Sequence, residues 1–87
     1  MELQQVLNKV RRICEELSDL IIKGGLVVLD ENDKERIELD KKELADIEAN
    51  MNAKGIKVSV IEKYIKLAKE LIEELEKMID EQEIKEN

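Results

Sequence analysis

The chain has 87 residues and a net charge of −7, because its 22 acidic residues outnumber its 15 basic ones. It has no histidine, tryptophan, phenylalanine or proline, one tyrosine and one cysteine. These counts exclude an internal disulfide. They argue against a zinc or acid–base catalytic site, and against nucleic-acid binding through base stacking or phosphate neutralisation.

Length and hydropathy set the expected class of protein. A chain this short forms one domain, residues 1–87, and buries only about 60 % of its unfolded surface, so it needs a compact core or a partner. The start of the chain lacks a basic segment followed by an apolar one, and the longest apolar run, residues 26–29, is far too short to span a membrane. We therefore expect a soluble, cytoplasmic protein without cofactor or metal, in agreement with its single unpaired thiol.

Residues 2–23 have the apolar spacing of an amphipathic helix, with the a, d and e positions of a heptad occupied throughout. Gly24-Gly25 predict the end of this helix at Lys23, because glycine readily takes the backbone conformation that follows a helix. The apolar residues are Leu3, Val6, Leu7, Val10, Ile13, Cys14, Leu17, Leu20 and Ile21.

The next segment changes its period, which predicts a β-hairpin over residues 26–39. A short aliphatic run is followed by five polar residues and then by an alternation of polar and apolar residues with period two. Asn32-Asp33 is the expected turn, since both residue types tolerate the left-handed backbone region. Two registers remain open, with Ile37 opposite Val28 or opposite Leu29.

A short helix is predicted over residues 41–54. Asp40 and Glu43 have the spacing of a capping box, in which each side chain accepts a hydrogen bond from the other residue's backbone N–H. Gly55 is expected to end this helix. Its apolar face is formed by Leu44, Ile47 and Met51.

A second long helix is predicted over residues 60–81, begun by a further capping box at Ser59 and Glu62. The polar tail, residues 82–87, is expected to fray. The helix repeats the a, d and e pattern with Ile61, Tyr64, Ile65, Ala68, Leu71, Ile72, Leu75, Met78 and Ile79.

The predicted fold is mainly α, in the α+β class: two long amphipathic helices connected by a β-hairpin and a short helix. Each stripe is wider than one facing helix can cover, so we expect a second copy to complete a helical-bundle dimer. The alternative is a monomer in which the hairpin and short helix fold back over the stripes. The e positions expected to form the oligomer or partner interface are Leu7, Cys14, Ile21, Ile65, Ile72 and Ile79.

Residues 34–65 resemble the ribbon-helix-helix family of DNA-binding proteins. The resemblance is carried by Ile37 and Leu39 as strand residues, Leu44, Ile47 and Met51 on a first helix, Gly55–Ser59 as the turn, and Ile61 and Ile65 on a second helix. It implies a dimer whose two-stranded ribbon places Lys34, Arg36 and Glu38 against the major groove of DNA.

These observations predict a small, acidic, non-enzymatic protein that acts by self-association, by binding a protein partner along its helical stripes, or by both. A nucleic-acid or membrane partner is not expected from the composition. A dimeric DNA-binding regulator, with Lys34 and Arg36 as the DNA contacts, is the alternative that the family resemblance supplies.

Overall fold

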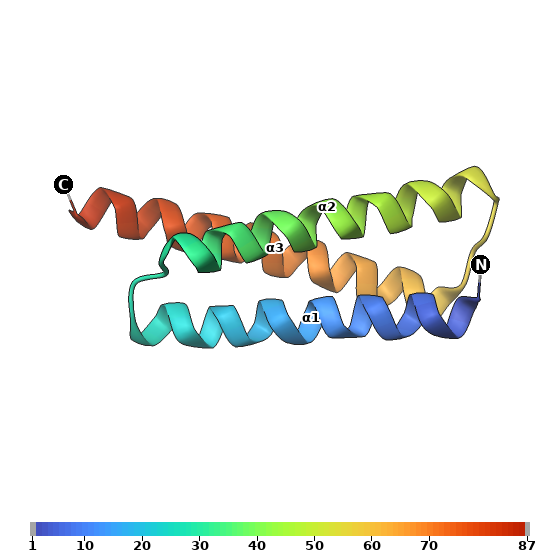
Figure 1. Cartoon of the computed structure of the whole chain (residues 1–87), viewed down its shortest axis with the longest axis horizontal. Helices are drawn as coiled ribbons and strands as arrows, with labels where there is room; N and C mark the ends of the chain where they lie inside the picture. Colours follow the sequence, from blue (N-terminus) through green and yellow to red (C-terminus); the bar gives the residue numbers. More distant parts are fainter. Residues whose placement is uncertain (1, 87) are drawn as a thin grey trace.

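The computed structural model describes residues 2–86, which form three helices in an elongated bundle of 46 × 19 × 19 Å (Figure 1). The helices are α1 (Leu3–Leu26), α2 (Glu31–Ala53) and α3 (Ser59–Glu86). In Figure 1 the chain runs from right to left through α1, returns from left to right through α2, and runs from right to left again through α3. Helices α1 and α3 are therefore parallel, and α2 is antiparallel to both. The predicted helical bundle is therefore confirmed.

The core lies mainly between α1 and α3, which pack closely along their length, whereas α2 lies farther from both. The two long apolar stripes meet there, as their spacing predicts. Side chains that are almost completely buried in this seam are Val10, Ile13 and Leu17 from α1, and Ile61, Ala68 and Leu75 from α3.

The predicted β-hairpin over residues 26–39 is wrong, and with it the α+β class, because residues 2–86 contain no strand. Most of the segment lies in α2, which begins with a capping box at the residues expected to form the turn. The Asp33 N–H donates to Asp30 Oδ1 at 2.9 Å, and the Asp30 N–H donates to Asp33 Oδ2 at 3.1 Å. The period-two interpretation placed Ile37 and Leu39 on one face, but Ile37 is 2 % exposed and Leu39 is 52 % exposed.

The helix predicted over residues 41–54 is the second half of α2. No glycine or proline interrupts residues 30–54, and the first turn is already capped, so the helix continues through Asp40 instead of starting there. Its predicted end is confirmed. Gly55 has a φ of 65°, and the Ile56 N–H donates to the Met51 carbonyl at 2.9 Å, as in a Schellman motif.

The first helix also ends later than predicted, at Leu26 instead of Lys23, because Gly24 and Gly25 both adopt helical backbone. A Cβ atom at Gly24 would overlap the sulfur of Met78, whereas one at Gly25 would contact nothing. Gly24 therefore serves the close approach of α1 to α3, not the termination of α1.

The prediction that residues 82–87 fray is wrong for residues 82–86, because α3 continues to Glu86. Asn87 lies outside the described residues. Gln82 gives this extension a structural role. Its side chain accepts a hydrogen bond from the Leu29 N–H at 3.0 Å and donates one to the Gly24 carbonyl at 3.0 Å. The end of α3 thus holds the connection between α1 and α2. At the other end α3 starts at Ser59, one residue earlier than predicted. The predicted capping box of Ser59 and Glu62 is wrong, because the Glu62 N–H donates to the Val58 carbonyl at 3.0 Å.

We predict that Asp30→Ala destabilises the protein by about 1 kcal/mol, the usual cost of losing an N-cap. Chemical denaturation measures the change, and Asp30→Ser should recover most of it because serine is also a good cap. Equal midpoints for wild type and Asp30→Ala would contradict the start of α2 at this position.

The two glycines of α1 provide a matched pair. Gly25→Ala should stabilise the protein by about 0.5–1 kcal/mol, because alanine restricts the unfolded chain and meets no neighbour in the helix. Gly24→Ala should stabilise the protein less than Gly25→Ala does, or destabilise it, because the Met78 side chain must move. Thermal unfolding of both variants checks the order, and the reverse order would show that α1 does not approach α3 at Gly24.

Candidate functional site

The e positions of α3 are covered by α2 of the same chain. Ile65, Ile72 and Ile79 each line a groove together with α2 residues, and Ile65 and Ile72 are only 6 % and 5 % exposed. α2 therefore occupies the place that the sequence analysis assigned to a second copy. In the monomeric alternative, a hairpin and a short helix fold back over the stripes. In the structure a single long helix, α2, covers the stripe of α3.

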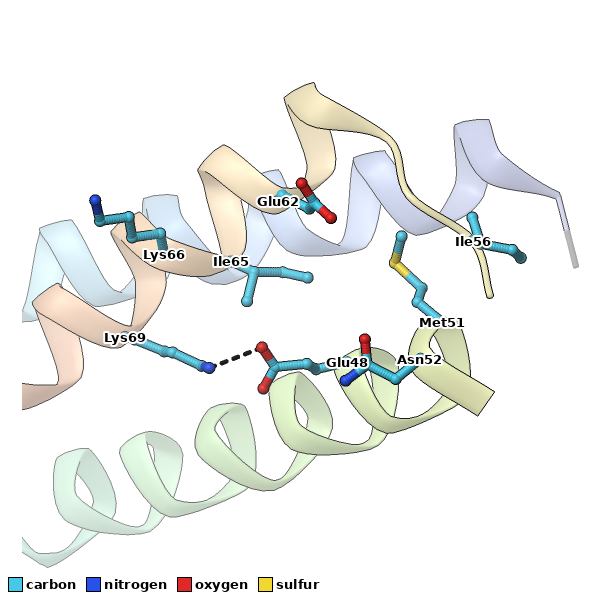
Figure 2. A pocket seen from close by; sticks show the side chains of 8 residues that line it. All are labelled: Glu48, Met51, Asn52, Ile56, Glu62, Ile65, Lys66 and Lys69. Atoms are coloured by element: carbon cyan, nitrogen blue, oxygen red, sulfur yellow. Dashed lines mark hydrogen bonds and ion pairs between the residues drawn. The ribbon is translucent and has the colours of Figure 1, made fainter. Parts of the chain in front are cut away.

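One groove, of about 270 Å³, lies between the end of α2 and the start of α3 (Figure 2). Met51 and Ile65 point toward each other across its floor, and the Lys69 ammonium pairs with Glu48 at 2.7 Å across its opening. Two more ion pairs cross the same seam, from Lys41 to Glu76 at 2.9 Å and from Lys34 to Glu83 at 3.3 Å. Its floor is apolar, Lys69 is paired, and Lys66 points away from the groove, so the groove has the character of an internal packing seam (Figure 2).

The e positions of α1 lie on the other side of the α1–α3 pair, away from α2. Cys14 is 5 % exposed, and its thiol donates to the Tyr64 carbonyl at 3.3 Å. It lies in a shallow groove of about 330 Å³ formed by α1 and α3 alone, with Tyr64 and Leu67 on the α3 side. Leu7 and Ile21, seven residues before and after Cys14, follow the same stripe and are partly buried.

These residues belong to a longer apolar surface that we call the open face. Its positions on α3 are separated by three or four residues. Three members of the open face are about two-fifths exposed: Leu3 of α1 (41 %), and Val60 (43 %) and Leu67 (42 %) of α3. No element of the described chain covers it. The open face consists of Leu3, Leu7, Cys14 and Ile21 from α1, and Val60, Tyr64, Leu67 and Leu71 from α3.

A second exposed apolar group lies at the end of the bundle, around the connection from α1 to α2. Ile22 and Leu26 occupy one face of the last turns of α1, and Val27 and Val28 continue into the loop. All four side chains are more than half exposed. The sequence analysis placed residues 26–28 in a strand.

Lys34 and Arg36 lie on α2, so the DNA-facing ribbon implied by the family resemblance is not formed by residues 2–86 of this structure. The Lys34 ammonium lies 3.5 Å from Glu31 and 3.3 Å from Glu83, and the hydrogen bond with Glu83 raises its pKa. A cation held by two carboxylates has a reduced capacity to neutralise a phosphate. DNA binding by this pair of residues stays a prediction.

Two aspartates of α2 are buried, and their partners differ. Asp33, which is 8 % exposed, is held by the Lys23 ammonium at 2.8 Å, and the hydrogen bond from Lys23 lowers the pKa of Asp33. Asp40 is 1 % exposed and faces the Glu16 carboxyl of α1. Burial and the hydrogen bond with Glu16 raise the pKa of Asp40 from 3.8 to about 7.

Within residues 2–86, no group of three or more cysteine, aspartate or glutamate side chains is arranged to hold a metal ion. No helix of that part of the chain is both long enough and apolar enough to cross a membrane. Comparison with protein-family models, with curated proteins and with solved structures found no match to the chain. Function must therefore be argued from the surfaces themselves.

Sequence reasoning did not single out Glu16, and it interpreted Asp40 as a helix cap. One signal was present. Asp33, Ile37, Asp40, Leu44 and Met51 follow helical spacing, so a continuous α2 would have placed both aspartates on its buried stripe. The open face could be found in part, since the e positions of α1 were identified. The exposed members from α3, Val60 and Leu67, were not.

We predict that Cys14 reacts slowly with a thiol reagent in the native protein. Burial raises the pKa of its thiol, which also donates to a backbone carbonyl, and the thiolate is the reactive form. Spectroscopic thiol labelling with and without denaturant measures the protection. Ser18→Cys in a Cys14→Ala background is the control, because Ser18 is more exposed in the same groove. Equal rates at the two positions would contradict the burial of Cys14.

Proposed function

We propose that the protein acts by pairing with a second copy of itself through the open face, and that it is an association module and not an enzyme. The observation that carries the proposal is the apolar stripe left on one side of the α1–α3 pair after α2 has covered the other side. Leu3, Val60 and Leu67 are its exposed members, and apolar surface left uncovered on a small protein can mark a contact site.

A second copy fits this surface because the open face is formed by two parallel helices (Figure 1) and extends on α1 from Leu3 to Ile21, about 27 Å at 1.5 Å per residue. A twofold axis would place the same stripe against itself, so that each apolar position meets another apolar position. The result is a four-helix core of α1, α3 and their symmetry copies, with each α2 on the outside. A stable interface of standard size buries roughly 800 Å² on each partner, which requires a surface of this length.

The charges beside the open face agree with self-pairing. Arg11, Glu15 and Asp19 border the groove at Cys14, so both signs are present next to the apolar stripe. A copy of the same surface can place Arg11 near an acidic residue of the partner. Nucleic acid offers only negative charge and would meet a chain of net charge −7.

The predicted interface is revised by this proposal. Leu7, Cys14 and Ile21 remain part of it, joined by Leu67 and its neighbours on α3. The e positions of α3 are used inside the chain. We further propose a reducing compartment such as the cytoplasm for the protein, supported by its single unpaired thiol.

Light scattering tests the proposal, with an expected mass of twice the chain at high concentration. Leu67→Lys should shift the mass to one chain without unfolding it, because at 42 % exposure a lysine can reach solvent in the monomer but not at the centre of a four-helix core. Leu39→Lys is the matched control, since Leu39 is 52 % exposed on α2, away from the open face.

Two outcomes would overturn the proposal. A mass of one chain for the wild type at every concentration tested rules out self-pairing. Dissociation by Leu39→Lys together with an unchanged mass for Leu67→Lys would place the interface on α2 instead.

A further inference from the structure

Two carboxyl groups, Glu16 of α1 and Asp40 of α2, face each other near the middle of both helices, and the Glu16 side chain is 34 % exposed. Asp40 is 1 % exposed, and its Oδ2 atom has no hydrogen-bond partner among the protein groups of the described chain. The Oε2 atom of Glu16 is also buried and also lacks one. A buried acceptor without a donor is costly, and both atoms are acceptors when ionised.

One proton resolves both defects. A protonated carboxyl donates a hydrogen bond, so a proton on Asp40 can be shared with the Glu16 carboxylate, and each orphan oxygen gains a partner. Without that proton, two negative charges face each other, and the Asp40 charge is shielded from water by its burial. We propose that Glu16 and Asp40 form a proton-binding site that makes the closure of α2 over the α1–α3 pair dependent on pH.

The other charged groups near the site do not replace the proton. Arg12, on α1, pairs with Glu43 at 3.2 Å and lies 4.0 Å from the other oxygen of Glu16. From α2, Arg36 favours the ionised form of Asp40 and Glu43 opposes it. α3 contributes none of the charges that act on Asp40. In the part of the chain that the structure describes, no cation donates a hydrogen bond to Oδ2 of Asp40.

The fold makes α2 the element that should respond. It packs less closely than α1 and α3 do against each other. Outside its apolar stripe it is joined by ion pairs, with Lys23–Asp33 and Arg12–Glu43 to α1 and Lys41–Glu76 among those to α3. Opening of α2 would uncover Ile65, Ile72 and Ile79, which are the α3 positions that the sequence analysis assigned to a partner. The proton site therefore controls access to a second apolar surface, separate from the open face.

The sign of the effect follows from the two pKa values of Asp40. The folded value of about 7 lies above the ordinary 3.8, so between them the closed state holds a proton that the open state has released. The stabilisation that this proton contributes is fully present below about pH 4 and is lost as the pH rises through 7. From about pH 5.5 to about pH 8.5, the equilibrium constant for closing should fall about thirtyfold.

The test combines hydrogen exchange of the α2 amides, corrected for the intrinsic effect of pH, with denaturant unfolding at the two ends of this pH range. Wild type should lose α2 protection at the higher pH. Asp40→Asn should remove most of the pH dependence, because an amide donates to the Glu16 carboxylate at every pH. Asp46→Asn is the matched control, an exposed aspartate on the same helix, and should follow the wild type.

Measurements in the Leu67→Lys background separate this inference from self-pairing, because the proton site does not depend on the open face. If Asp40→Asn fails to fold, carbon-13 titration of the Asp40 carboxyl in the wild type still decides, with a midpoint near 7 expected. Glu16→Gln should move that midpoint to lower pH. Titration of Asp40 near 4, or equal pH dependence in wild type and Asp40→Asn, would overturn the proposal.

Discussion

The packing of α1 against α3 is the contact on which the rest of the structure depends. Val10, Ile13 and Leu17 are completely buried there, and Gly24 lets the two helices approach where Met78 crosses. Because the two helices are parallel, the chain between them must return along the whole bundle. A hairpin with a short helix would place both at one end, whereas α2, at 23 residues and about 1.5 Å per residue, makes the return as a single element.

α2 is consequently a helix whose sequence serves several demands. Its buried stripe carries Asp33 and Asp40 between apolar residues. Asp33 has a lysine and a capping partner, so its charge is compensated at the end of the helix. Asp40 lies near the middle of the helix, where the ionisable group that acts on it most strongly is a second carboxyl, that of Glu16. This contrast between the two aspartates is the basis of the proposed proton site.

Three helices cannot surround two wide stripes. α2 covers one flank of the α1–α3 pair, and the other flank remains as the open face, with Cys14 at its centre and Leu67 partly exposed beside it. Association through the open face and movement of α2 therefore concern opposite sides of the same pair of helices. The two proposals therefore concern separate surfaces and do not exclude each other.

The sequence by itself determined the two long amphipathic helices, their apolar stripes and the end of α2 at Gly55, because these depend on spacing and on local backbone preference. It did not decide between a hairpin and a helix for residues 31–39, since Arg36-Ile37-Glu38-Leu39 alternates equally well on a strand. The tertiary structure decided that choice, by burying Ile37 while Leu39 stays in solvent and by capping the helix at Asp30. It also decided which flank α2 covers and that Asp40 faces Glu16. Contacts between residues far apart in the chain depend on helix packing, which a pattern of one helix at a time does not contain.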